Sequence, residues 1–199
     1  MSPLAGQQIP QNCSYAKKLY NMRQRLTVPA WDDLRAPASA INPAGSAAAA
    51  VVSTVDGSLT FSNGQTQTIA LWFQMPHAWK VGSDVSLHVH WAKSTSAAGT
   101  VKWQSKYEWT NIGATRGGYS AFVDGTAAIS DSDTAGKHAL FEFTDLPGTG
   151  KTISSMIGVV LQRLSSGGSA DTYGADVSLF EIDIHYQIDG FGSYLEYTK

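Results

Sequence analysis

From about Val51 onward, apolar and polar residues alternate along the chain in short runs, and Gly, Asn, Asp and Ser separate the runs. A period of two is typical of strands with one face in a core and the other in water. The pattern predicts eight strands, at Ser58–Ser62, Thr66–Gln74, Asp84–Lys93, Thr100–Asn111, Tyr119–Val123, Lys137–Thr144, Ile153–Leu164 and Val177–Ile188. Eight antiparallel strands joined by loops of several residues favour a two-sheet sandwich, and the jelly roll is the usual eight-stranded form. We therefore predict an all-β jelly roll over residues 49–199.

The alternation is clearest in two of these strands. In VKWQSKYEWT, one side carries Val101, Trp103, Ser105, Tyr107 and Trp109. In the last strand, the predicted apolar face carries Phe180, Ile182, Ile184, Tyr186 and Ile188. The opposite face of that strand carries Leu179, Glu181, Asp183, His185 and Gln187. One face of each strand is thus predicted to lie in the core and the other in water.

Residues 1–48 differ from the rest of the chain in their pattern of apolar and polar residues, and they are predicted to form an N-terminal arm. A short helix is expected at about 14–26, where four apolar residues share one face, namely Tyr15, Leu19, Met22 and Leu26. Four basic residues lie elsewhere on this helix, namely Lys17, Lys18, Arg23 and Arg25. A Pro/Ala/Ser-rich strap follows over 36–50. The helix packs either on its own domain or on another subunit.

Composition narrows the function classes. The chain has 199 residues, of which 43% are hydrophobic, and its formal net charge is −2. Residues 1–48 hold five basic and two acidic residues (+3), and the remainder hold nine and fourteen (−5). A charge of +3 is too small for a nucleic-acid footprint, so we expect the arm to contact another acidic partner. No membrane span and no secretory signal are expected. A single cysteine, Cys13, excludes an intrachain disulfide.

The stretch LPGTGKT (146–152) resembles the phosphate-binding loop of ATPases. The pattern of that loop is G-x-x-x-x-G-K-[ST]. Gly150 and Lys151 match its second glycine and its lysine, but Asp145 occupies the position of the first glycine. The residues that follow, ISSMIGVVLQRL, have a period of two and predict a strand rather than the required helix. We interpret the stretch as a Pro-Gly turn between two strands.

The stretch SLHVHWAK places His88 and His90 on the same face of one strand, as two imidazoles on one metal ion would be. With Gly82 it matches the first half of the cupin pattern, but no carboxylate follows between 91 and 99. A third ligand would come from His185 or Asp183 on the last strand. The alternative is that the histidines are hydrogen-bonded surface or interface residues. His77 and His138 stand alone in the sequence and are predicted to be structural.

The sequence carries no G-x-S-x-G nucleophile motif. Two closely placed carboxylate pairs occur, at Glu181 with Asp183 and at Asp131 with Asp133, but spacing alone does not indicate glycosidase chemistry. We expect no enzyme activity, no catalytic residues and no cofactor.

Several longer strings carry a resemblance, namely WDDLRAP, QMPHAWKVGSDVSLHVHW, KYEWTNIG and DVSLFEIDIHYQIDGFGSYLEYTK. Over about Trp31 to Lys199 the chain resembles a family of tailed-bacteriophage virion structural proteins with a jelly-roll β-sandwich. The resemblance implies a non-enzymatic protein made in the host cytoplasm and present in many copies on the virion. It also implies a homo-oligomer, with a trimer expected as for capsid cement proteins, and contacts to the major capsid protein or other virion proteins, but not to nucleic acid or membrane.

The sequence is compatible with three functions. The first is a capsid cement or decoration protein whose arm clamps the major capsid lattice, with Trp31 anchoring the arm to the body. The second is a collar, head-fibre or tail component that contacts the host through loops 111–119, 124–137 and 165–174. The third is a cupin-like metal-binding protein that uses His88, His90 and His185.

Overall fold

The computed structural model describes residues 30–41, 43, 50–129, 134–165, 170–193 and 195–199. Within these ranges the chain is almost entirely β. The elements are β1 (Ala30–Pro37), the 3-10 helix η1 (Ala38–Ala40), β2 (Val51–Val52), β3 (Leu59–Phe61), β4 (Thr66–Gln74), β5 (Val85–Lys93), β6 (Gly99–Thr110), β7 (Val123–Ile129), β8 (His138–Glu142), β9 (Met156–Leu164) and β10 (Val177–Ile188). The predicted all-β class is confirmed.

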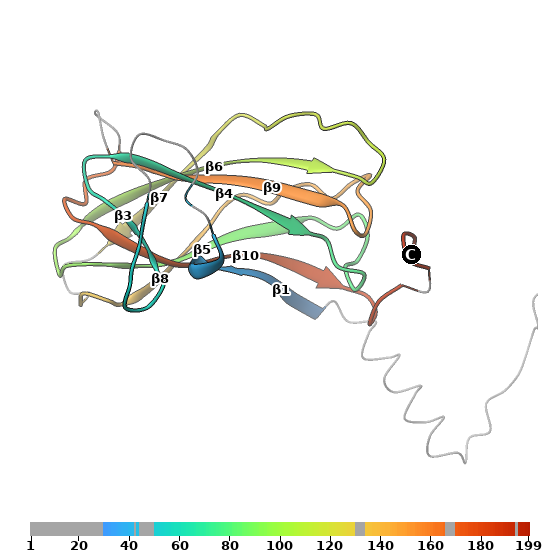
Figure 1. The fold of residues 1–199 in the computed structure, drawn as a ribbon, viewed down its shortest axis with the longest axis horizontal. Coiled ribbons are helices and arrows are strands. Elements are labelled where there is room, and N and C mark those ends of the chain that lie inside the picture. The colour runs from blue at the N-terminus through green and yellow to red at the C-terminus, as the bar shows by residue number, and fades with distance from the viewer. Residues whose placement is uncertain (1–29, 42, 44–49, 130–133, 166–169, 194) are drawn as a thin grey trace, which may run out of the picture.

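The strands form two antiparallel sheets that face each other (Figure 1). Sheet A has the order β2-β3-β10-β5-β8, with β1 also paired to β10, and sheet B has the order β4-β9-β6-β7. From β3 onward the chain crosses to the other sheet at every connection except β6 to β7. The resulting orders, 3-10-5-8 and 4-9-6-7, are those of a jelly roll, so the predicted sandwich topology is also confirmed.

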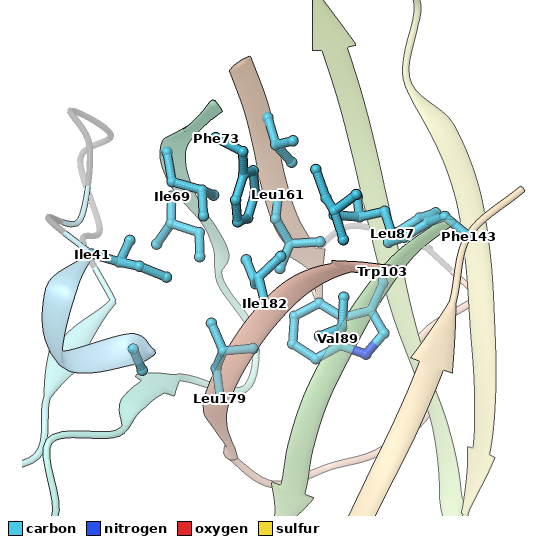
Figure 2. Packing of buried hydrophobic residues seen from close by; sticks show 14 of the residues in the cluster. Ile41, Ile69, Phe73, Leu87, Val89, Trp103, Phe143, Leu161, Leu179 and Ile182 are labelled. Carbon is cyan, nitrogen blue, oxygen red and sulfur yellow. The ribbon is translucent and has the colours of Figure 1, made fainter. Parts of the chain in front are cut away.

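The core lies between the two sheets and is filled by the inward residues of the alternating strands. Figure 2 shows Ile69 and Leu161 of sheet B pointing toward Leu179 and Ile182 of sheet A. All four side chains are fully buried. Three indoles, those of Trp79, Trp91 and Trp103, are also buried. Large aromatic side chains of this kind supply much of the apolar area that folding removes from water.

Most strand predictions match the observed elements closely, but three features were missed or misplaced. The strand expected at Tyr119–Val123 is instead β7, which begins at Val123 and pairs with β6. Strands β1 and β2 were not predicted. The apolar face of the last strand is wrong at its start, because a bulge between Leu179 and Glu181 turns Leu179 into the core and leaves Phe180 exposed.

The described part of the predicted arm is built into sheet A. Strand β1 pairs antiparallel with β10 from Ala30 opposite Ile188 to Pro37 opposite Glu181. Ala38 and Ile41, which follow β1, are buried in the core. Residues of the expected strap therefore contribute to the sandwich. The expected helix at 14–26 lies outside the described residues.

One buried ion pair crosses from β9 to the loop before β10. The Arg163 side chain is fully buried and donates twice to the Asp171 carboxylate, at 2.9 and 3.1 Å. Its remaining N–H groups donate to the backbone carbonyls of Phe61, Ala175 and Tyr173. All five N–H groups of the buried guanidinium therefore donate to an acceptor, as the burial of a charge requires.

Glycine at position 148 is required by space, since a Cβ there would lie 1.9 Å from the backbone oxygen of Ser83. We expect Gly148→Ala to lower the free energy of unfolding by about 1–3 kcal/mol, because backbone must move to relieve the overlap. Gly117→Ala is the matched control, since a Cβ at Gly117 meets nothing within 4 Å. Urea denaturation of both variants measures the difference, and equal stability would contradict the predicted clash.

Among the described residues, no helix is long and apolar enough to cross a membrane.

Candidate functional site

The outer face of sheet A carries a cluster of ionisable side chains because alternate residues of its strands point away from the core. In β5, Leu87 and Val89 point inward and are buried in the core, so His88 and His90 lie on the outer face. The neighbouring strands add further polar side chains at matching positions of the register. We call the set the histidine cluster; its members are Asp33, Ser86, His88, His90, His138, Glu142, Asp183 and His185. Four of the protein's five histidines belong to it.

The pairing of β5 with β10 and β8 brings distant residues together at the centre of this face. His88 lies opposite Asp183 on one side and Glu142 on the other. The Asp183 Oδ1 atom lies 4.0 Å from His88 Nδ1 and 3.4 Å from His90 Nε2. Although they are on the outer face, the side chains of His88 and Asp183 are only 7% and 3% exposed. A carboxylate and two imidazoles are thus held together largely out of water.

The three atoms that face one another make no hydrogen bond. His88 Nδ1, His90 Nε2 and Asp183 Oδ1 are all buried and without a hydrogen-bond partner. Buried polar atoms are satisfied in the great majority of cases, and an exception calls for an explanation such as a bound ion. One ligand atom from each of the three residues lies within 4.8 Å of the other two. The centre of the cluster therefore has the residues and the spacing to hold a small cation.

The other polar atom of each of these residues is held by a neighbour. His88 Nε2 lies 3.3 Å from Ser86 Oγ, and His90 Nδ1 lies 2.8 Å from His138 Nε2. Asp183 Oδ2 lies 3.1 Å from His185 Nε2. These contacts fix the orientation of all three side chains.

Glu142 lies at the edge of the cluster and determines, through Ser86, which tautomer of neutral His88 the hydrogen bonds favour. The Ser86 hydroxyl donates to Glu142 Oε1 at 2.7 Å, and this bond holds the pKa of the Glu142 carboxyl below its usual range. Because the Ser86 hydrogen is used there, Ser86 Oγ can only accept from His88 Nε2. The hydrogen-bond network therefore places the proton of neutral His88 on Nε2 and leaves a lone pair on Nδ1.

The sequence anticipated part of this cluster. His88, His90 and the alternative third ligands Asp183 and His185 do come together. Asp183 is the third residue whose carboxylate faces both histidines of β5. His185 Nε2 is instead hydrogen-bonded to Asp183 Oδ2 and lies 3.0 Å from Asp33 Oδ1. His138 was predicted to stand alone and does not, because β8 pairs with β5 and places it against His90.

The remaining histidine lies elsewhere. His77 Nε2 and Nδ1 are 3.0 and 2.7 Å from the hydroxyls of Ser154 and Ser193. These contacts connect the turn after β4 with the C-terminal segment. This agrees with the structural role predicted for His77.

The LPGTGKT stretch forms a turn between β8 and β9, with no helix after it. Gly148 N donates to Asp84 Oδ1 at 2.9 Å, and Lys151 Nζ donates to the backbone oxygen of Trp109 at 2.7 Å. The lysine of a phosphate loop would point to a ligand, but Lys151 is bonded to its own chain. The turn interpretation is confirmed.

The predicted docking helix, with Tyr15, Leu19, Met22, Leu26 and its basic residues, lies outside the described residues. Trp31 lies in β1 opposite Gln187, and its side chain is 57% exposed. The strand holds Trp31 in place through its backbone, while the indole remains largely in solvent.

Five exposed apolar residues belong to segments that lie next to the C-terminal end of β10, which pairs with the start of β1. We call this group the apolar end; its members are Trp31, Val81, Phe191, Leu195 and Tyr197. Figure 1 shows the start of β1 and the C-terminal segment at this same end. The segment is tied down there, since Lys199 Nζ donates to the backbone oxygens of Ala78 and Trp79. Exposed apolar residues on neighbouring segments are candidates for an interaction surface.

A second surface lies on the outer face of sheet B. The Arg116 guanidinium lies 5.0 Å from the Trp72 ring centre and is bonded at 3.0 Å to Glu108 Oε2. Lys106 Nζ lies 4.7 Å from the ring centre of Phe122. Trp72 and Phe122 remain partly exposed. Arg116 and Phe122 of the loop after β6, together with Trp72 of β4 and Lys106 of β6, therefore form a platform of aromatic and cationic groups.

No protein-family model matches the sequence, and no curated protein matches it. Solved structures with similar folds include the enzymatically active domain of bacteriophage CBA120 tailspike protein 4 (10% identity, TM-score 0.36, 79% of this chain and 19% of that chain). They also include the infectious bursal disease virus Gx strain structure (15% identity, TM-score 0.40, 82% and 34%). A third is TmCBM61 in complex with β-1,4-galactotriose (10% identity, TM-score 0.32, 79% and 87%). The chain spans about a third or less of the phage and viral chains, and likenesses this distant support no inference about function.

Proposed function

We propose that the protein is a structural component of a phage virion, which binds neighbouring subunits through its apolar end and residues 1–29. The observation that carries this proposal is the placement of the apolar end. Its five exposed apolar residues are on segments beside the end of β10, where the chain enters the sandwich at β1. An apolar surface and an adjoining segment can bind one partner together, because attachment of the first raises the effective concentration of the second.

The finer assignment is a capsid cement or decoration protein, assembled as a homo-oligomer, with a trimer as the proposed form. The jelly-roll body and the phage-like strings between Trp31 and Lys199 support this assignment. The major capsid protein is the proposed partner, and no enzyme activity is assigned. In this role the protein would stabilise the shell through many repeated contacts.

The first test is the number of copies in purified particles of the phage. A cement protein is expected at hundreds of copies, in fixed proportion to the major capsid protein. A gel-quantified ratio between the two proteins measures this directly. A few dozen copies or fewer would contradict the cement role and favour a component at one vertex.

The apolar end can be tested by substitution at Phe191, which is 80% exposed. We expect Phe191→Asp to lower incorporation into particles at least about tenfold, because a charge would have to be buried at the contact. Val55→Asp is the matched control, since Val55 is 94% exposed in the loop before β3. That strand pairs with the opposite end of β10, at Val177–Leu179. Equal incorporation of the two variants would contradict the proposed surface.

A second candidate function is a collar, head-fibre or tail component that contacts the host surface. The observation that favours it is the platform on sheet B, where Trp72 and Phe122 are partly exposed beside Arg116 and Lys106. Aromatic and cationic groups side by side are common in binding surfaces. A low copy number, together with loss of host adsorption in Trp72→Ala particles, would support this role over cement.

A further inference from the structure

We propose that the centre of the histidine cluster is a binding site for a divalent transition-metal ion, with His88 Nδ1, His90 Nε2 and Asp183 Oδ1 as its ligands. Two imidazole nitrogens and one carboxylate oxygen form a donor set that suits zinc and its first-row neighbours. The site lies on the outer face of sheet A and ties β5 to β10.

The unpartnered atoms are the main observation. Burial removes His88 Nδ1 and Asp183 Oδ1 from water, yet neither makes a hydrogen bond. Leaving a buried polar atom without a hydrogen bond destabilises the folded protein, and here three such atoms face each other. A bound cation would satisfy all three at once. In each of the three side chains, the atom without a hydrogen-bond partner is the one that faces the other two side chains.

The distances are close to those of a metal site. Ligand bonds of about 2.0–2.2 Å place neighbouring donors about 3.3–3.6 Å apart in a tetrahedral site. The Asp183 Oδ1 atom lies 3.4 Å from His90 Nε2 and 4.0 Å from His88 Nδ1. Small side-chain rotations on binding would close the remaining gap.

The surrounding contacts are those that metal ligands usually have. Each ligating side chain in a metal site normally has its second polar atom held by a neighbour, which fixes its tautomer and its orientation. Here Ser86 holds His88, His138 holds His90, and His185 holds Asp183. The Ser86 contact in addition leaves His88 Nδ1 unprotonated, as a ligand must be.

A rival grouping of Asp33, Asp183 and His185 fits less well. In that group His185 Nε2 is already hydrogen-bonded to Asp183 and lies 3.0 Å from Asp33 Oδ1, so a metal would have to displace existing contacts. In the group of His88, His90 and Asp183, the three facing atoms make no hydrogen bond that a metal would have to displace. The His90 side chain is 24% exposed, which gives the ion a path from solvent.

The test is titration of the full chain, without an affinity tag and after removal of metal by a chelator, with Zn²⁺ and separately with Co²⁺. We expect one equivalent per chain by calorimetry and a visible Co²⁺ absorption band of a nitrogen-ligated site. Added Zn²⁺ should also raise the unfolding temperature of the wild-type chain.

Substitutions locate the ion. His88→Leu, His90→Leu and Asp183→Asn should each lower the affinity at least about 100-fold, and loss of the supporting His138 in His138→Ala should lower it about 10–100-fold. His77→Ala is the control and should bind as the wild type does, because His77 lies outside the cluster. If a leucine variant does not fold in chelator, the nearly isosteric Asp183→Asn decides the question.

Absence of stoichiometric binding by either metal would overturn the proposal, and so would unchanged affinity in a folded Asp183→Asn protein. Binding that is lost in His77→Ala but kept in His90→Leu would also overturn it. None of these measurements depends on incorporation into particles, so their outcome is separate from that of the structural role.

Discussion

Replacing Arg163 with methionine is expected to lower the free energy of unfolding by about 3–5 kcal/mol. The substitution removes one partner of an ion pair whose side chains are 0% and 1% exposed. Asp171 would keep the N–H of Lys102 as a donor at 3.0 Å but would lose the guanidinium that neutralises it. Three backbone carbonyls would lose their donor as well. Urea denaturation followed by tryptophan fluorescence measures the loss.

Two further variants separate the buried charge from the loss of packing. Arg163→Met combined with Asp171→Leu should recover part of the stability, because it removes the uncompensated carboxylate but restores no donor to the three backbone carbonyls. Arg35→Met is the exposed control, because the Arg35 side chain is 67% exposed where it pairs with Glu181. It should cost far less than Arg163→Met, because solvent screens an exposed ion pair. A loss in Arg163→Met no larger than that of Arg35→Met would contradict the role given to the buried pair.

The alternation of residues was enough to predict the sandwich, because a period of two marks the strands whichever sheet they join. It could not predict β1, since AWDDLRAP has a proline and two adjacent aspartates and no alternation of its own. Its conformation comes from pairing with β10, which is a contact between distant parts of the chain. The bulge at Phe180 is likewise invisible in the sequence, because one inserted residue shifts the pattern without breaking it.

The histidine cluster, too, could be predicted from the sequence only in part. His88 and His90 could be placed on one face from their spacing alone, because alternate residues of a strand share a face. Their partners on β8 and β10 depend on which strands are neighbours, and this follows from the jelly-roll topology. Assigning the jelly-roll strand order to the predicted strands would have placed the strand of His138 next to the strand of His90. The alternation of His138, Leu140 and Glu142 was the available signal.

Deleting residues 1–29 is expected to leave the unfolding free energy of the sandwich unchanged, whereas deleting residues 1–41 should lower it by at least about 3 kcal/mol. The longer deletion removes β1, the buried Ala38 and the buried Ile41. It also takes away Asp32, which accepts a hydrogen bond at 3.0 Å from the Tyr186 hydroxyl. Burial and this neighbouring carboxylate raise the pKa of Tyr186, so its hydroxyl stays protonated and continues to donate.

The longer deletion should have a second effect. It uncovers the edge of β10 from Glu181 to Ile188, and an unpaired strand edge invites association with other chains. Size-exclusion chromatography should therefore show aggregates for the 1–41 deletion and none for the 1–29 deletion. Equal stability of the two truncated chains would mean that β1 contributes nothing to sheet A. Loss of particle incorporation in the stable 1–29 deletion would show that the N-terminal residues act in binding rather than in folding.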